Sequence, residues 1–160
     1  MSEIRILTVR QPWAWAIIHG GKDVENRVRN IAGDYRGTVA IHAAVANHKF
    51  APDETDRIPE ALHQMMRDNR EIVKEFEAWP WYQNRGLILG TVDLVGEHWS
   101  GMECSRGVTC HEYELCSPWS EAYVHHLVLR NPRPLRTPLP FKGALGLRRF
   151  DSTLLDGGFR

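Results

Sequence analysis

The sequence predicts a single α+β domain built around a small, curled sheet. Five to seven short stretches carry the apolar pattern of strands, and only two stretches carry a helical pattern. The connections between the strands are too short for repeated βαβ units, which argues against a doubly wound parallel sheet. No internal repeat and no interdomain linker interrupts the pattern. We therefore expect one domain over residues 1–150 and a C-terminal tail over residues 151–160.

The expected strands alternate with turns that are bounded by glycine or proline. They cover residues 4–9, 23–28, 37–43, 87–95, 124–129 and 145–150. Residues 132–140 contain four prolines, which cannot donate ladder hydrogen bonds, so we expect no strand there. Residues 98–120 are expected to form an irregular insertion, because cysteine, glycine and serine are frequent in them.

Two helical segments are expected. The first covers residues 13–19, because Pro12 suits the first turn of a helix and a pair of glycines follows the segment. The second lies within residues 51–79, where apolar side chains recur with a period of 3.6 residues until a Trp-Pro pair ends the pattern.

The composition excludes several classes of protein. The 160 residues are 42% hydrophobic, and 20 Lys+Arg balance 20 Asp+Glu. No apolar run approaches the roughly 18 residues of a membrane span, and the chain does not open with a basic segment followed by a long apolar stretch. Three cysteines, an odd number, argue against a secreted disulfide framework. We expect a cytoplasmic protein with no membrane partner.

The charges are unevenly distributed along the chain. The net charge is +3 over residues 1–50, −7 over residues 51–130 and +4 over residues 131–160. If the two ends of the chain meet in the fold, they form a basic surface on an otherwise acidic molecule. Such a surface would favour an anionic partner.

One short motif combines charged residues with a turn. Gly20, Lys22, Glu25 and Arg27 form the pattern GxKxxExR directly after the expected first helix. Glu25 and Arg27 share one face of the expected strand and could pair. Lys22 follows the glycines, where backbone N–H groups and a cation can converge on an anion or a carbonyl. Alternatively, these charged residues form only a salt-bridge network on the surface and have no function in binding or catalysis.

The motif and its context resemble the ASCH family. The string Arg10-Gln11-Pro12-Trp13-Ala14 precedes GxKxxExR as in that family, and residues 131–147 resemble the closing strands of ASCH domains. The resemblance covers roughly residues 4–150 and implies a PUA-like small β-barrel or curled mixed sheet with helical insertions. It also implies a pocket between helix and barrel that the motif lines and that binds RNA or a modified nucleoside. A role in RNA metabolism, or in the regulation of translation or transcription, would follow.

Other side chains near the motif are candidates for the same pocket. Arg10 could hold a phosphate, Gln11 could pair with a base edge, and Trp13 offers a stacking surface. His42 lies on the strand face opposite its apolar neighbours, where a histidine is more often structural. Lys142 could supply a second cation from the closing turn. The expected ligand-binding residues are therefore Arg10, Gln11, Trp13, Lys22, Glu25, Arg27, His42 and Lys142.

Two other functions remain open. Some ASCH proteins resemble amidohydrolases of acylated cytidine, in which a lysine activates a threonine hydroxyl; Glu25 stands at the position of that threonine and cannot act as the same nucleophile. A hydrolase, either a ribonuclease or a nucleoside amidohydrolase, would use Glu25 as a general base on water and Lys22 to stabilise negative charge. The other alternative is a protein-interaction or coactivator module that binds through acidic residues of the segment 51–79, such as Glu71 and Glu75.

Cysteine and histidine residues cluster in the expected insertion. His98, Cys104, Cys110 and Cys116 lie within 19 residues, and thiolate and imidazole are the ligands that zinc prefers. However, there is no CxxC pair, and five residues separate each cysteine from the next. His125-His126 in the following strand add further candidate ligands. A structural zinc site is one interpretation, and reduced cysteines in a loop are the other; no other cofactor is expected.

Overall fold

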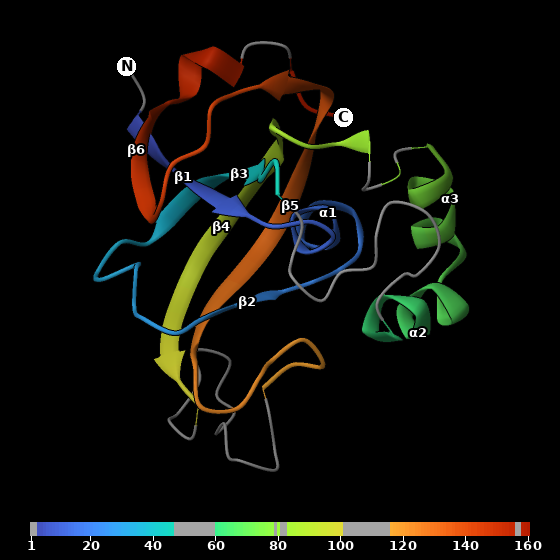
Figure 1. Ribbon diagram of the computed structural model, residues 1–160, viewed down its shortest axis with the longest axis horizontal. Coiled ribbons are helices and arrows are strands. Elements are labelled where there is room, and N and C mark those ends of the chain that lie inside the picture. The colour runs from blue at the N-terminus through green and yellow to red at the C-terminus, as the bar shows by residue number, and fades with distance from the viewer. Residues whose placement is uncertain (1–2, 47–59, 79, 81–82, 101–115, 156–157) are drawn as a thin grey trace.

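The computed structural model describes most of the chain. The described residues are 3–46, 60–78, 80, 83–100, 116–155 and 158–160 (Figure 1). The strands are β1 (Glu3–Val9), β2 (Val24–Arg27), β3 (Gly37–Ala43), β4 (Leu87–Trp99), β5 (His125–Pro140) and β6 (Leu147–Asp151). The helices are α1 (Trp13–His19), α2 (Glu60–Asp68) and α3 (Arg70–Ala78), and a short 3₁₀ helix (Ser152–Leu155) follows β6. None of these described helices is both long enough and apolar enough to cross a bilayer.

The six strands form one mixed sheet in the order β2-β5-β4-β3-β1-β6 (Figure 1). β1 and β3 run parallel and are joined by a crossover that contains α1 and β2, and the other neighbours are antiparallel. The prediction of an α+β fold around a mixed sheet is therefore confirmed. The resemblance implies a small β-barrel or a curled mixed sheet, and the barrel is wrong, because in the described residues β2 pairs only with β5 and β6 only with β1. These edge strands have four and five residues, which leaves few backbone groups to close the sheet.

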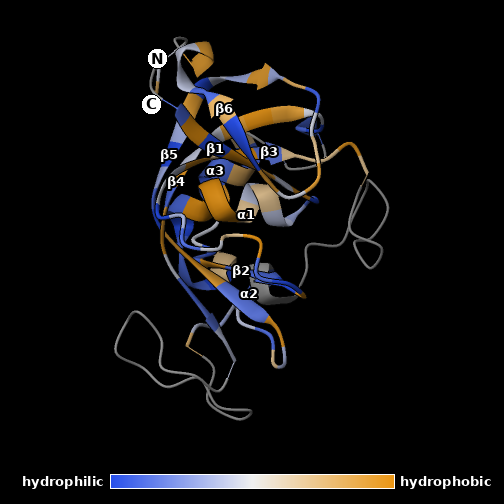
Figure 2. Ribbon diagram, turned by 90° about the vertical axis from the view of Figure 1, so that its left-hand side faces the viewer, coloured by the Kyte–Doolittle hydropathy of each residue, from blue (hydrophilic) through white to orange (hydrophobic). Residues whose placement is uncertain are grey.

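α1 covers one face of the sheet and forms the centre of the main hydrophobic core. Residues 14–18 are all buried, and Trp15 is fully enclosed. They pack against apolar side chains of β3, β4 and β5, and burying one such side chain as large as Ile17 contributes about 2 kcal/mol. In Figure 2 the α1 ribbon is coloured mainly as hydrophobic, as a helix enclosed on most sides requires.

α2 and α3 lie beyond α1, on the side away from the sheet (Figure 1). Trp15 of α1 meets Phe76 of α3 edge to face, with ring centroids 5.7 Å apart. The sequence predicts one helix here, but the chain forms two, because it turns at Asn69. The Asn69 side-chain oxygen accepts a hydrogen bond of 3.0 Å from the backbone N–H of Glu71 and so caps the start of α3.

The opposite face of the sheet carries a second, smaller core. Its buried residues are Ile4, Ile6, Ala40, Ile88, Leu135, Phe150 and Leu155. His42 lies on this side, with its ring centroid 6.2 Å from that of Phe141, whereas Val39 and Ile41 belong to the main core. The prediction that His42 points away from its apolar neighbours is thus confirmed.

β5 continues through residues 132–140, where the sequence predicts no strand. β2 pairs only with residues 125–128 of β5, so the proline-rich end of β5 has a full strand, β4, on one side only. Proline is tolerated on such an edge, because no second ladder needs its missing N–H. The β4–β5 ladder also shifts register in three places. Gly90 permits the close approach there, since a Cβ on it would lie 2.4 Å from the carbonyl oxygen of Arg133.

Residues 158–160 of the expected C-terminal tail are held against β5. The backbone N–H of Arg136 donates to the carbonyl of Gly158 at 3.1 Å, and that of Arg160 donates to Pro134 at 2.9 Å. Leu135 and Phe159 form an antiparallel bridge. The last residues therefore add to the edge of the sheet.

The two ends of the chain meet where β6 pairs with β1. Arg5 lies opposite Arg149 in this ladder, and Arg148 lies opposite Ile6. Glu3 contacts Arg149 at 3.5 Å and offsets part of the positive charge. The uneven charge of the sequence thus becomes a group of arginines on one edge of the sheet.

Candidate functional site

A cavity of about 800 Å³ opens beside the GxKxxExR motif. β1, α1 and β2 supply one part of its lining, and residues 118–124 supply another. The charged lining residues are Arg10, Lys22, Glu25, Arg27 and Glu121, and the aromatic ones are Trp13 and Trp119. The volume falls within the range of about 300–1,000 Å³ that is usual for small-ligand sites.

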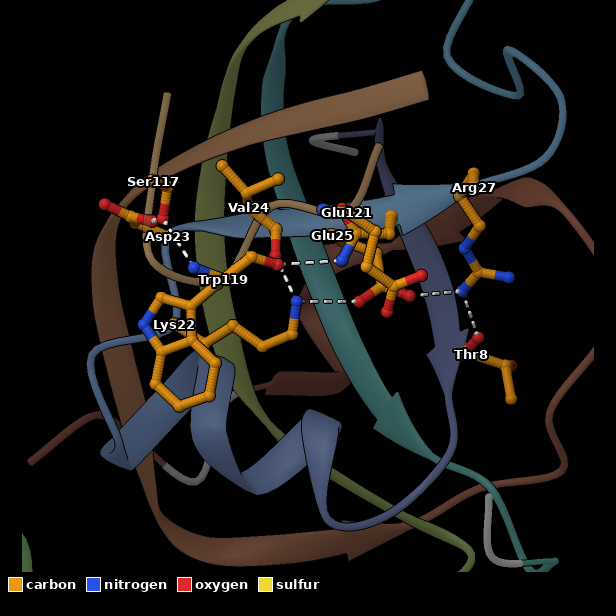
Figure 3. Close-up of polar contacts among 10 residues, drawn as sticks. Thr8, Lys22, Asp23, Val24, Glu25, Arg27, Ser117, Trp119 and Glu121 are labelled. Atoms are coloured by element: carbon orange, nitrogen blue, oxygen red, sulfur yellow. Dashed lines mark hydrogen bonds and ion pairs between the residues drawn. The ribbon is translucent and has the colours of Figure 1, made fainter. Parts of the chain in front are cut away.

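Lys22 is placed in the cavity by the turn between α1 and β2. Gly21 has a φ of +74°, which glycine adopts without strain, and the Lys22 backbone N–H then donates to Ala16 at 2.9 Å. The Lys22 side chain is buried, and its ammonium donates to the carbonyl of Val24 (Figure 3). Lys22 Nζ also lies 3.5 Å from Glu25 Oε2. The turn therefore inserts a cation under the first residues of β2.

Glu25 links this cation to a second one. It is buried on β2, and its other carboxylate oxygen, Oε1, lies 3.1 Å from Arg27 Nη2. The same Arg27 nitrogen donates to the carbonyl of Thr8 on β1 at 2.9 Å (Figure 3). A continuous chain of charge-assisted contacts therefore joins the turn, β2 and β1. The sequence-based prediction that Glu25 and Arg27 pair is confirmed.

The ammonium of Lys22 is held in surroundings that disfavour its charge. Burial lowers the pKa of Lys22, and the neighbouring Glu25 carboxylate opposes that shift. Glu121 and Asp23 also oppose it, more weakly. A buried cation with a perturbed pKa in a cavity is more typical of a functional site than of a surface salt-bridge network.

Two tryptophans flank the ammonium. Lys22 Nζ lies 5.9 Å from the ring centre of Trp13 and 6.0 Å from that of Trp119, which is within reach of a cation–π contact. The two rings meet edge to face, with centroids 6.2 Å apart. The cavity thus combines flat aromatic surfaces with fixed charges.

Trp119 reaches the cavity on a segment that is fastened to β2. Ser117 Oγ donates to Asp23 at 2.5 Å, and Asn26 Nδ2 donates to the carbonyl of Trp119 at 2.8 Å. The backbone N–H of Glu121 donates to Asn26 Oδ1 at 3.1 Å. The sequence analysis did not identify Trp119 or Glu121 as site residues. These contacts span more than 90 residues, and no local pattern indicates them.

Three of the expected ligand-binding residues do not line the cavity. Gln11 is fully buried, where its side chain donates to the carbonyl of Asn84 at 2.7 Å and accepts from the backbone of Trp15 at 3.0 Å. His42 bonds to the carbonyl of Phe141 at 2.9 Å, and burial lowers its pKa. Lys142 is exposed and lies outside the lining. Arg10, Trp13, Lys22, Glu25 and Arg27 are the expected residues that the fold brings together.

The acidic side chains named for the alternative of a protein-binding surface have partners within the chain. Glu71 pairs with Lys74 at 2.8 Å on the surface of α3. Glu75 lies 3.1 Å from both His19 and Arg160. Glu75 therefore joins α3 to α1 and to the C-terminal residues.

The expected metal ligands are described only in part. His98 and Cys116 lie close together, and His126 joins them; one ligand atom from each lies within 4.8 Å of the others. Such a group could hold a metal ion. Cys104 and Cys110 lie outside the described residues. Of the expected ligand set, the fold thus brings His98 and Cys116 together, and it adds His126, which the sequence analysis named as a further candidate.

No protein family model matches this chain. The resemblance to ASCH domains therefore depends only on the motif, on the residues directly before it and on residues 131–147. What the protein does has to be inferred from the cavity, its charges and its aromatic surfaces.

Proposed function

We propose that this protein is an ASCH-like domain of PUA-like type that binds RNA, or a modified nucleoside, in the cavity lined by GxKxxExR. The observation that carries the proposal is the buried ammonium of Lys22, held beside Glu25 between two tryptophans in a cavity of about 800 Å³. A nucleoside offers the complementary groups, which are a flat ring, carbonyl acceptors and amino donors.

The charge of the lining supports a ligand that carries phosphate. The charged lining residues comprise three cations and two carboxylates, so one positive charge is left over. Arg10 is exposed and could hold a backbone phosphate, while Lys22 and Glu25 are buried deeper and contact the base. Phosphate contacts position a nucleic acid, and base contacts select it.

The rim of the cavity supports a ligand larger than one nucleoside. Val28 and Leu145 both line the cavity and are 82% and 91% exposed. Exposed apolar side chains at a pocket mouth can contact the bases that flank a base held inside. We therefore favour a short single-stranded RNA segment as the natural ligand.

Binding can be tested by calorimetric titration with a single-stranded RNA panel and with cytidine and N4-acylated cytidine. We expect Lys22→Met, which keeps an unbranched side chain of similar size and removes its charge, to weaken binding at least tenfold. Lys74→Met on α3 is the matched control, because that lysine is exposed and pairs only with Glu71 among the described residues. Wild-type protein that binds none of these ligands, or equal affinity in both variants, would contradict the proposal.

A hydrolase is the second candidate, because a lysine with a lowered pKa faces a carboxylate in the same cavity. Against it, both oxygens of Glu25 are engaged by cations, which disfavours proton abstraction from water. If the protein is a hydrolase, the wild type should convert RNA or N4-acylated cytidine to a product that chromatography detects. Folded Glu25→Gln protein should then form no product. Bound but unconverted ligand would leave binding as the function.

A further inference from the structure

His98, Cys116 and His126 converge on one point at the end of the sheet opposite β6. His98 of β4 and His126 of β5 are directly opposed in the ladder, so their side chains leave the same face. Both are buried. Cys116 approaches them from the segment that precedes β5, and its side chain also packs against Val128.

The distances among the three ligand atoms are those of a metal site. His126 Nδ1 lies 3.1 Å from His98 Nε2, and Cys116 Sγ lies 3.6 Å from each of these nitrogens. Zinc binds imidazole at about 2.0–2.1 Å and thiolate at about 2.3 Å, so tetrahedral angles separate two nitrogens by about 3.3 Å and a nitrogen from sulfur by about 3.5 Å. The three observed edges agree with such a triangle to within about 0.2 Å.

The groups around the triangle prepare its atoms to act as ligands. His126 Nε2 lies 2.6 Å from the carbonyl of Glu121, so it carries the proton and donates, which leaves the lone pair of Nδ1 directed at the triangle. Ser120 Oγ lies 3.2 Å from Cys116 Sγ and can donate to a thiolate. Each of these contacts favours the protonation state that a metal ion requires.

We propose that His98 Nε2, Cys116 Sγ and His126 Nδ1 bind zinc, or a divalent ion of the same class. A sulfur and two imidazole nitrogens form a donor set that suits zinc. The ligand set differs from the one that the cysteine spacing indicates, because a histidine of β5 takes part. A metal-free, hydrogen-bonded trio is the competing arrangement, and it needs no thiolate.

The proposed ion has a structural consequence. It would join β4 and β5 to the segment of residues 116–121, which carries Trp119 and Glu121 into the lining of the cavity. Cys116 lies just before that segment's hydrogen bonds to β2, and the Glu121 carbonyl bonds directly to a proposed ligand. The metal would therefore stabilise one side of the cavity without contacting a ligand in it.

Cobalt substitution tests the proposal independently of any cavity ligand. Metal-free full-length protein titrated with Co²⁺ should bind one equivalent and develop a thiolate-to-cobalt charge-transfer band, which zinc then displaces. Cys116→Ser should abolish the band, and His126→Gln should weaken Co²⁺ binding at least tenfold. His125→Gln is the matched control, because His125 is adjacent, pairs with Glu97 and leaves the opposite face of the strand. We expect it to bind as the wild type does.

Several results would overturn the proposal. One is wild-type protein that shows no charge-transfer band with stoichiometric cobalt. Another is a band that survives Cys116→Ser, or a band that is lost in the double variant Cys104→Ser, Cys110→Ser. That double variant keeps the test decisive if Cys116→Ser fails to fold, because its full retention of the band assigns the thiolate to Cys116.

Discussion

At the scale of single residues, Lys22 and Glu25 carry most of the functional argument. A buried ammonium and carboxylate recover less through mutual attraction than they lose in hydration unless further contacts satisfy them. Here Val24, Arg27 and the two tryptophan rings supply those contacts. Because such a pair contributes little net stability, its presence beside a cavity supports the proposal of ligand recognition.

The pair should show strong energetic coupling. We expect Glu25→Gln to lower the free energy of unfolding by about 3 kcal/mol, because it leaves the Lys22 ammonium buried without its counterion. Adding Lys22→Met should recover most of that loss, since the uncompensated charge is then removed. Urea denaturation of the two single variants and the double variant measures the coupling. Additive effects would show that the two side chains do not act as a pair.

At the scale of elements, the sequence-based predictions are accurate where local interactions define an element and inaccurate where contacts between distant segments define it. The helix at residues 13–19 and the strand at residues 37–43 were predicted at their observed bounds, because local turn residues and periodicity define them. β5 was predicted too short, because its tolerance of proline depends on its pairing with β2 stopping at Val128, opposite Val24, and the sequence does not show this tertiary contact. The placement of Trp119 beside Lys22 depends on contacts between segments far apart in the chain, for the same reason.

The contact between α1 and α3 should make stability depend on pH. Burial lowers the pKa of His19 to about 4, with Glu75 opposing and Arg160 assisting the shift. As the pH falls, His19 is protonated in the unfolded chain before it is protonated in the folded one. The contribution of His19 to the free energy of unfolding is therefore full above about pH 6.5 and decreases by about 3 kcal/mol towards pH 4. Urea denaturation at several pH values should show this slope in the wild type and a flatter one in His19→Gln. Equal slopes would exclude His19 as the source.

A second acid-sensitive contact acts in a lower window and can be separated from the first. The Arg133 guanidinium pairs with Asp93 across β4 and β5 and lowers the pKa of that carboxyl to about 2. This contribution is present above about pH 4 and is lost as the pH falls towards 2. Because the pair is partly exposed, its effect is smaller than that of His19.

At the scale of the whole molecule, one open sheet holds two separate groups of candidate functional side chains. α1 and the turn after it place Lys22 on one face, and the cross-strand pair of His98 and His126 lies at the ends of β4 and β5. The segment of residues 116–121 contacts both groups. The resemblance to ASCH domains indicated the first group, but it could not indicate the open sheet or the contact between His98 and His126, since both depend on strand pairing.

The most direct test of the proposed binding function uses the indole N–H signals of the tryptophans in ¹H–¹⁵N spectra. During titration with single-stranded RNA or a modified nucleoside, the signals of Trp13 and Trp119 should shift together, because both rings line the cavity. The signal of Trp15, which is fully enclosed in the core, should stay in place. Lys22→Met should remove the shifts. Spectra that do not change with any of these ligands, or shifts confined to tryptophans outside the cavity, would contradict ligand binding at this site.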